Sequence, residues 1–440
     1  MSESSTLFPE ESSSAPGPTS TPSATIPAPR LKRANRAQLL LRPVDLDATI
    51  AADHQARSLW QLVAGLDLSK FLEPIRAREG LPGQSAIDPA IHVTLWSYAT
   101  SQGIGSAREL DRLCKEHDAY RWILGGVTVN YHTLSDFRVD HQAALDELVS
   151  QVLAVMLKEG LVTLTRVAQD GTRIRASAGA DSFRRERTLQ EHLAEAKTQV
   201  EHVRELADDP TVTARELAAQ KRAAREREER ITRALNVELP KLRESKKTEE
   251  EKTEARISTT DPEARVMKMP DAGYRPAYNV QFATTTEEKV IVGVGVTNIG
   301  SDKNELGPML AQIEKRTGTR PKEVLVDGGF VKLEEIESAA RQGSTVYAPL
   351  SKKKGQEPDY TPKHGDSEEI AAWRARMGSD AGKTIYKERG ETAELPNAHV
   401  KARFGLTQLP VRGSTKVLTM GLWMALTFNM LRWLSLTNSA

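Results

Sequence analysis

Two runs rich in β-branched residues lead into an aspartate, and this pattern limits the fold of the chain more than any other feature. The first run, in which Thr163, Thr165 and Val167 occupy every second position, leads into Gln169-Asp170-Gly171-Thr172. The second run is Glu323-Val324-Leu325-Val326, and it leads into Asp327. Open α/β sheets place functional groups where strands end, because the strand fixes the backbone and the next loop leaves the side chain accessible. We therefore expect an α/β domain in which each strand ends at an acid, with Asp170 and Asp327 as the leading functional candidates.

The segments around these runs also have the pattern of a sheet domain. Residues 278–284 and 289–297 have strand character and flank the acidic turn Thr286-Glu287-Glu288, which predicts a β-hairpin. A helical pattern follows the second aspartate, with apolar positions at Leu333, Ile336 and Ala339. An Asp-Gly pair also commonly caps a turn or a helix, so a purely structural role for each aspartate remains the alternative.

Residues 44–160 have apolar side chains at helical spacing and are expected to be all helical. Ser106 is a suitable N-cap for a helix over residues 107–115, Gly125-Gly126 ends a second short helix, and a third begins near Thr133. Three short helices with tight turns are compatible with a DNA-binding helix-turn-helix, and equally with any small helical domain.

The N-terminal residues differ in composition from the rest of the chain. Residues 1–30 are mainly Ser, Thr and Pro with a few acids, which predicts a disordered tail and not a signal peptide. A basic run follows at Arg30, Lys32, Arg33 and Arg36. The formal net charge of only +1 can hide such local basic surfaces, so DNA is not excluded as a partner. The single cysteine, Cys114, excludes an intramolecular disulfide and a Cys-rich zinc site, and favours the cytoplasm.

The segment from Asp181 to Arg256 contains 18 basic and 18 acidic residues and almost no aromatic ones. One apolar stripe runs through Leu189, Leu193, Ala196, Val200 and Val203. With Asp208-Asp209-Pro210 as the turn, this pattern predicts an insertion of two antiparallel helices, whose removal leaves the sheet folded. We expect its charges to form a hydrated face, with a DNA or partner contact as the alternative.

The run from Val417 to Leu436 is apolar enough to raise the question of a membrane span. It is interrupted by Thr419, Thr427, Asn429 and Arg432, and its uninterrupted apolar part is shorter than the roughly 20 residues that a membrane span needs. We therefore expect a buried core helix and no membrane partner.

A third motif, Tyr386 to Glu394, interleaves acids and bases densely and is followed by Lys401. Pro396 is tolerated in the first turn of a helix, so Glu394 is expected near a helix start, with Lys401 seven residues later on roughly the same face. Ion pairs on an exposed helix would explain the same pattern.

In this order, the motifs of the chain resemble those of the bacterial insertion-sequence DDE transposases, which have an RNase H-like catalytic domain and a Y…R…E…K signature. The resemblance covers most of the chain. The part ahead of the catalytic domain is similar at residues 87–89, 106–110 and 132–138. The two catalytic aspartates correspond to Asp170, within residues 167–176, and Asp327, within residues 326–330. The signature corresponds to Tyr386, Arg389, Glu394 and Lys401.

The resemblance implies an architecture for the whole chain. Behind the tail, residues 31–160 would form a helical, DNA-binding domain. Residues 161–440 would form the RNase H-like catalytic domain, a mixed sheet with flanking helices, interrupted by the helical insertion at 181–256. The two aspartates are 157 residues apart, a long interval for such a domain unless this insertion is present.

The resemblance also implies a site. Asp170, Asp327 and Glu394 would be the catalytic, metal-binding acids, and we expect them to lie within a few ångströms of one another. They would hold two divalent ions, Mg²⁺ or Mn²⁺, because such a pair serves phosphodiester chemistry and prefers hard oxygen ligands. The signature residues Tyr386, Arg389 and Lys401 would contact DNA phosphates. The interval from Arg389 to Glu394 is one residue longer than is commonest in the wider family, which leaves Glu391 as a rival third acid.

The expected function is that of a transposase. It would bind the terminal inverted repeats of its element and target DNA, and catalyse metal-dependent strand cleavage and strand transfer. We expect it to act as a homo-oligomer on DNA, in the cytoplasm and at the nucleoid. One alternative is an RNase H-like metal-dependent nuclease without strand transfer. Another is a non-catalytic helical DNA-binding or assembly protein whose carboxylates are structural caps.

Overall fold

The computed structural model describes residues 43–77, 85–206, 213–351 and 357–438. Residues Asp45–Ala440 form one compact unit. The expected tail, the basic run that follows it and the expected turn at Asp208-Asp209-Pro210 lie outside the described residues.

The described residues from Asp45 to Lys158 contain helices and no strands, as expected. The elements are η1 (Asp47–Thr49), α1 (Gln55–Ala64), α2 (Ser69–Leu72), α3 (Pro89–Ser101), α4 (Ala107–Glu116), α5 (Asp118–Leu124), α6 (Tyr131–Asp140) and α7 (Gln142–Lys158). The Ser106 hydroxyl caps α4 by accepting from the Glu109 N–H, and Gly125 ends α5 in the left-handed conformation, with φ 56°. Helix α6 begins two residues before the expected start, because the Asn130 side chain accepts from the N–H groups of His132 and Thr133.

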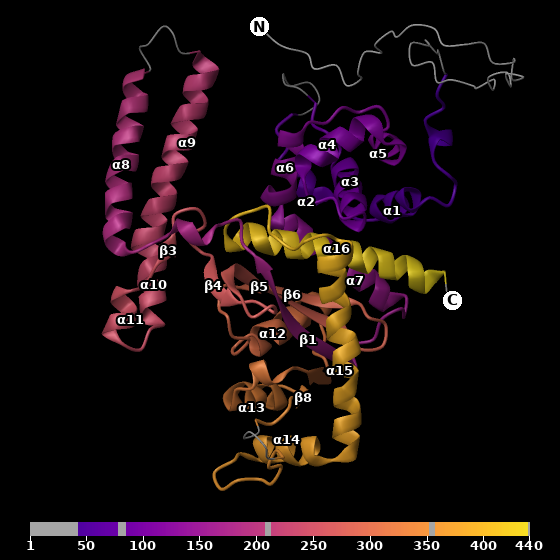
Figure 1. Ribbon diagram of the computed structural model, residues 1–440. Helices are drawn as coiled ribbons and strands as arrows, with labels where there is room; N and C mark the ends of the chain where they lie inside the picture. Colours follow the sequence, from indigo (N-terminus) through magenta and orange to yellow (C-terminus); the bar gives the residue numbers. More distant parts are fainter. Residues whose placement is uncertain (1–42, 78–84, 207–212, 352–356, 439–440) are drawn as a thin grey trace, which may run out of the picture. The chain divides into compact units, whose positions relative to one another are not determined.

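A mixed sheet lies at the centre of the remaining chain (Figure 1). Its strands are β1 (Arg166–Arg175), β4 (Arg265–Lys268), β5 (Tyr274–Thr285), β6 (Ile291–Thr297), β7 (Glu323–Leu325) and β8 (Thr345–Tyr347). Strand β5 pairs antiparallel with β1, and on its other side with β4 and β6, while β7 and β8 extend the sheet parallel to β1. The expected hairpin is β5–β6, and the sheet with its helices is an RNase H-like core.

Helices cover both faces of the sheet. The helical elements between β6 and the last helix are α12 (Leu306–Thr317), η5 (Gly328–Phe330), α13 (Leu333–Arg341), α14 (Glu368–Gly378), α15 (Asp380–Ala398) and the π-helical turn η6 (His399–Arg403). On one face, Met309 of α12 approaches Gly293 of β6, where the absence of a side chain leaves room for it. On the other face, α15 packs against β1 and β5.

The last helix, α16 (Ser414–Thr437), is the expected core helix. It packs against β6 as well as against α3 and α7 of the helical region. The Trp423 indole donates to the Arg138 carbonyl of α6, and the Asn429 amide bonds both backbone groups of Ile291 on β6. By length and composition it is the one described helix that could cross a membrane, but 72 % of its most apolar window is buried inside the protein. A core helix passes the same test of length and composition.

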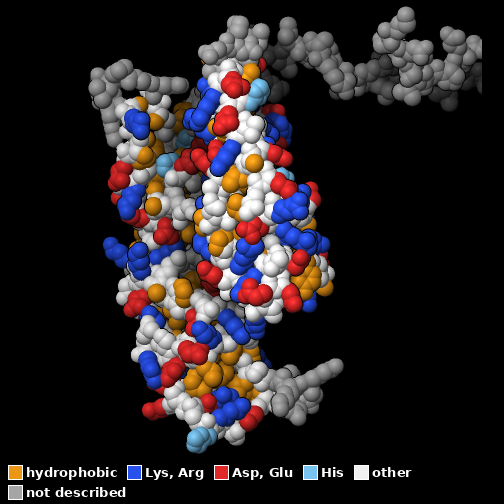
Figure 2. Space-filling model, turned by 90° about the vertical axis from the view of Figure 1, so that its left-hand side faces the viewer, with side chains coloured by type: hydrophobic (Ala, Val, Ile, Leu, Met, Phe, Trp, Pro, Cys, Tyr) orange, Lys and Arg blue, Asp and Glu red, His pale blue; other side chains and the backbone are white. Residues whose placement is uncertain are grey.

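The charged insertion contains the two expected antiparallel helices, α8 (Glu186–Glu205) and α9 (Ala214–Arg233), which lie side by side (Figure 1). Around them lie η2 (Ala180–Ser182), β2 (Phe183–Arg184), the π-helical turn η4 (Ala234–Glu238), α10 (Leu239–Glu244), α11 (Glu249–Thr253) and β3 (Ile257–Ser258), which pairs with β2. Acidic and basic side chains intermingle on the face shown in Figure 2, as in a hydrated surface. The base of the insertion is tied to the sheet because Glu238, buried, pairs with Arg265 of β4 at 2.6 Å.

Two local expectations are wrong. Asp170 does not end its strand, because β1 continues to Arg175 through its pairing with the long strand β5. Glu394 and Pro396 lie near the end of α15 and not at its start, because the helix already begins at Asp380, where Ser379 caps it. Helix α15 accommodates Pro396 within its last turn before the π-helical turn begins.

Candidate active site

Asp170 and Asp327 reach the same site from neighbouring parallel strands. Strand β1 pairs with β7 only as far as Ala168 opposite Leu325, so Asp170 lies just beyond the end of this pairing. Asp327 follows β7 by two residues and caps η5 by accepting from the Gly329 N–H at 2.7 Å. The sheet topology therefore brings together two acids that are far apart in the sequence, and the capping role proposed as an alternative for Asp327 is also present.

The guanidinium of Arg389 lies between these two carboxylates. Its Nη2 atom is 3.3 Å from Asp170 Oδ1 and 3.7 Å from Asp327 Oδ2. A second residue of α15, Asn397, donates from Nδ2 to the other oxygen of Asp170 at 3.2 Å. Helix α15 thus supplies both a cation and an amide to the pair of acids.

The electrostatics of the site centre on Asp170. Its pKa is raised to about 6, mainly by burial; Arg389 and the N–H of Gly171 lower the pKa, while the negative charges of Asp327 and Asp302 raise it. Burial lowers the pKa of Lys401, against the attraction of Asp170. Burial also raises the pKa of Tyr386, a group that interacts with Arg389 and both aspartates. Tyr386, Arg389 and Lys401 therefore all surround the carboxylates.

Glu394 is less closely engaged than the other signature residues. Its side chain is exposed and makes no hydrogen bond or ion pair in the described part of the chain. At about 100° per residue, Glu394 lies about 60° around α15 from Asn397, while Glu391 lies about 120° away. Glu394 is therefore on the flank of the face that meets Asp170, and Glu391 is turned further from it. The structure brings Asp170 and Asp327 together, but does not bring Glu394 into direct contact with them.

The donor chemistry of the pair fits a divalent cation. Asp170 and Asp327 offer carboxylate oxygens, the ligands that Mg²⁺ prefers, and the guanidinium of Arg389 already supplies positive charge between them. The raised pKa of Asp170 reflects mainly the burial of its carboxylate, which this guanidinium offsets only in part. Among the described residues, no group of three or more His, Cys, Asp or Glu side chains is arranged to hold a metal ion. These two acids therefore fit a divalent cation.

Two residues of this site were not predicted from the sequence. Asn397 carries no charge and lies between Glu394 and Lys401, so the pattern of acids and bases did not single it out. Asp302 lies in the loop between β6 and α12, and the only signal in the sequence is an acid soon after a strand.

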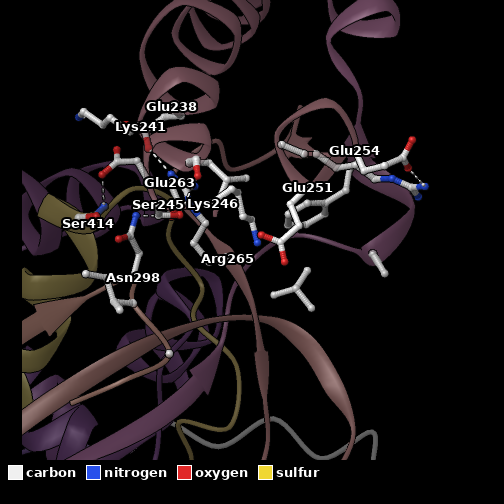
Figure 3. Close-up of a pocket in the computed structure, with 18 of the residues that line it drawn as sticks. Glu238, Lys241, Ser245, Lys246, Glu251, Glu254, Glu263, Arg265, Asn298 and Ser414 are labelled. Atoms are coloured by element: carbon white, nitrogen blue, oxygen red, sulfur yellow. Dashed lines mark hydrogen bonds and ion pairs between the residues drawn. The ribbon is translucent and has the colours of Figure 1, made fainter. Parts of the chain in front are cut away.

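Two hollows lie away from these carboxylates. One, of about 960 Å³, lies between the insertion and the β4 edge, lined by residues such as Lys241, Lys246 and Arg265 (Figure 3). Another, of about 530 Å³, lies between the helical region and the loop after η6, and Arg108, Tyr131 and Gln408 are among its lining residues. Arg108 there lies over the ring of Tyr131, 5.3 Å from its centroid.

Comparison with known protein families gives two matches. Residues 44–140 match a family model described as "Transposase domain (DUF772)", and residues 247–430 match one described as "Transposase DDE domain". Asp327 and Glu394 lie inside the second match, and Asp170 lies between the two. No curated protein and no solved structure matches the chain.

Proposed function

Because the chain belongs to the insertion-sequence DDE transposases, we propose that it binds the terminal inverted repeats of its element and catalyses metal-dependent DNA strand cleavage and strand transfer. The observation that carries this proposal is the approach of Asp170 and Asp327 to a single guanidinium from parallel strands. Two acids that share one cation provide the electrostatic setting that a metal site requires.

In this proposal, Asp170, Asp327 and Glu394 hold the two divalent ions, Mg²⁺ or Mn²⁺. Such ions, when bound, activate a water or a 3′-hydroxyl as nucleophile and stabilise the leaving oxygen. Asn397 keeps Asp170 in position through its amide. Glu394 approaches from α15, and its exposed, unpaired side chain is free to change rotamer.

The remaining signature residues bind and orient the DNA backbone. Arg389 would be free to bind a phosphate in place of its two carboxylate partners, because a bound cation would balance the charge of the acids. Tyr386 and Lys401 flank the same carboxylates and offer a hydroxyl and an ammonium group to neighbouring phosphates. The helical region, with Arg108 and Tyr131 in its hollow, binds the element ends, and we propose that the active complex is a homo-oligomer that holds two ends.

The test uses DNA that flanks the gene on both sides, since inverted repeats there would supply the substrate. The purified protein with Mg²⁺ is expected to cleave at the repeat ends and to join the 3′-hydroxyl ends to target DNA. Asp170→Asn should abolish both reactions but leave end binding nearly intact, because the metal-facing charge is lost and the DNA-contacting surface is kept. Asp53→Asn, an exposed change in the turn before α1, is the matched control and should remain active.

Three other outcomes would contradict parts of the proposal. Cleavage without joining would identify a nuclease. Specific binding without any cleavage in Mg²⁺ or Mn²⁺ would favour a non-catalytic DNA-binding protein. Equal loss of binding and cleavage in Asp170→Asn would indicate a folding defect, which circular dichroism would reveal.

A further inference from the structure

Asp302 places a further carboxylate beside the two aspartates. Its Oδ1 atom accepts hydrogen bonds from Asn279 Nδ2 and from Gln281 Nε2, each at 2.7 Å. Both donors are buried residues of β5, so they fix this oxygen firmly. The loop itself is anchored because Gln169 of β1 donates to the Glu305 carbonyl at 3.1 Å. Asp302 therefore has a defined position and is not a mobile surface acid.

Two glycines leave the space that this carboxylate occupies. A Cβ on Gly171, directly after the first aspartate, would lie only 2.6 Å from Asp302 Oδ1. A Cβ on Gly329 would lie 3.2 Å from Asp302 Oδ2 and 2.9 Å from Asp327 Oδ1. Beyond Ala168, β1 has no β7 neighbour, so the end of the sheet is open on the side where these groups meet. Because Gly171 and Asp170 point to opposite faces of β1, Asp302 lies across this strand from the Asp170 side chain, with Oδ2 toward the Asp327 loop.

The carboxylates of Asp302 and Asp327 bring negative charges close together, and no cation pairs with Asp302 among the described residues. Both hydrogen-bond donors to Asp302 are neutral amides, and no Lys, Arg or His side chain pairs with it in the described part of the chain. Arg389 contacts Asp170 and Asp327 but not Asp302. The Asn279 side chain is only 1 % exposed, and its Oδ1 atom has no hydrogen-bond partner among the described residues. Buried oxygens without donors are the surroundings that a hard cation stabilises.

We propose that Asp302 is a fourth acidic residue of the metal site, which binds one divalent cation together with Asp327 through Oδ2 while the β5 amides hold Oδ1. This inference rests on the proposed function, because it assigns a residue to the same site. The competing explanation is purely structural, namely that Asp302 only satisfies the amides of Asn279 and Gln281. The two explanations differ in whether charge on Asp302 affects metal binding.

The test measures Mn²⁺ binding to the full chain by electron paramagnetic resonance of free Mn²⁺, with no DNA present. Asp302→Asn is the chosen variant because its carbonyl oxygen can still accept from both amides. Unsubstituted protein is expected to bind Mn²⁺, and Asp302→Asn should weaken one binding step at least tenfold. Asp302→Glu should recover part of this loss, and Asp53→Asn should bind like the unsubstituted protein. Thermal unfolding without metal checks that the variants are folded.

The outcomes separate this inference from the proposed function. A change of less than twofold in folded Asp302→Asn, while Asp170→Asn loses Mn²⁺ binding, would overturn the role of Asp302 and leave the proposed site standing. A loss of thermal stability in Asp302→Asn with unchanged Mn²⁺ affinity would establish the structural explanation instead. An unsubstituted protein that binds no Mn²⁺ would contradict both proposals.

Discussion

At the scale of single residues, the surroundings of Asp170 disfavour the charged form of its carboxyl group. Its pKa of about 6 is above the ordinary value of 3.8, mainly because it is buried. A carboxyl group with a higher pKa in the folded state binds protons more tightly when folded. The contribution of this group to the free energy of unfolding is therefore most favourable below about pH 4, and it decreases as the pH rises to about 6.

Asp170→Asn should consequently stabilise the metal-free protein at high pH. We expect the free energy of unfolding to increase by about 1–3 kcal/mol at pH 8, since each pKa unit corresponds to about 1.4 kcal/mol. At pH 4 the difference should nearly vanish, because Asp170 is then largely protonated and resembles asparagine. Urea unfolding in EDTA at both pH values measures this, and an equal effect at pH 4 and pH 8 would refute the burial argument.

Gly171 gives a second prediction at this scale. A Cβ there would lie 2.3 Å from Gln281 Nε2 and 2.4 Å from Asn279 Oδ1, so Gly171→Ala should force β1 and β5 to adjust. We expect a loss of about 1–3 kcal/mol in the free energy of unfolding. The matched control is Gly390→Ala in α15, where no atom lies within 4 Å of the added Cβ. That change should be neutral or stabilise by up to about 1 kcal/mol, and equal destabilisation of both variants would contradict the prediction.

At the scale of elements, local patterns predicted the strands and most helices, but not where long elements end. Ser106 and Gly125 marked helix ends through local chemistry, which a sequence displays directly. The strand through Asp170 continues because β5 lies beside it, and that partner is about a hundred residues away. Pro396 suggested a helix start, yet α15 accommodates it near the other end because Ser379 had already started the helix. Tertiary pairing therefore set the end of β1, whereas a cap earlier in the sequence set the start of α15.

The helical insertion can be divided by its packing. Val200, Val203 and Ala224 form a small apolar cluster in the outer part, and Leu189, Leu239 and Ile257 belong to a separate one near the sheet. We expect that residues 197–225 can be replaced by a short Gly/Ser bridge, since Glu195 and Arg227 lie side by side at 3.2 Å where the cut is made. The shortened protein should remain soluble and unfold within a few degrees of the original.

The base of the insertion should behave differently. Glu238→Ala leaves Arg265 without its carboxylate partner, and losing one member of a buried ion pair typically costs about 3–5 kcal/mol. Thermal unfolding of the two variants therefore tests where the removable part ends. Insolubility of the shortened protein, or an unchanged midpoint in Glu238→Ala, would show that this division is wrong.

At the scale of the whole molecule, the site combines residues that no local pattern could bring together. The order of acids, bases and glycines was enough to suggest a family, and through it Asp170, Asp327 and the residues of α15. Asp302 was not predicted, because the position of its carboxylate depends on side chains of β5 and on the space left by Gly171 and Gly329. The order of motifs along the chain can suggest candidate residues, but proximity that only the fold creates, as between Asp302 and the Asp327 loop, has no signal in the sequence.

DNA binding by the whole protein should depend on Arg389 and Lys401 through charge alone. Each is expected to neutralise about one phosphate, so changing either to Ala should lower the slope of log affinity against log salt by about 0.9 on duplex DNA. Filter binding at several salt concentrations measures the slope. Arg341→Ala removes an exposed arginine that pairs with Glu337 of the same helix and with Glu369 of α14, and should leave the slope unchanged. An unchanged slope for Arg389→Ala would argue against phosphate contact.

Helix α16 has a consequence for how the protein is made. It follows every other element of the fold in the sequence, yet it lies between the helical region and the sheet and bonds to both through Trp423 and Asn429. While the chain is still on the ribosome, neither part has its complete core. Fragments that end before α16 would expose the apolar surfaces of β6 and α3 and become substrates for proteases. Translation must therefore continue through α16 before the helical region and the sheet can each complete their core.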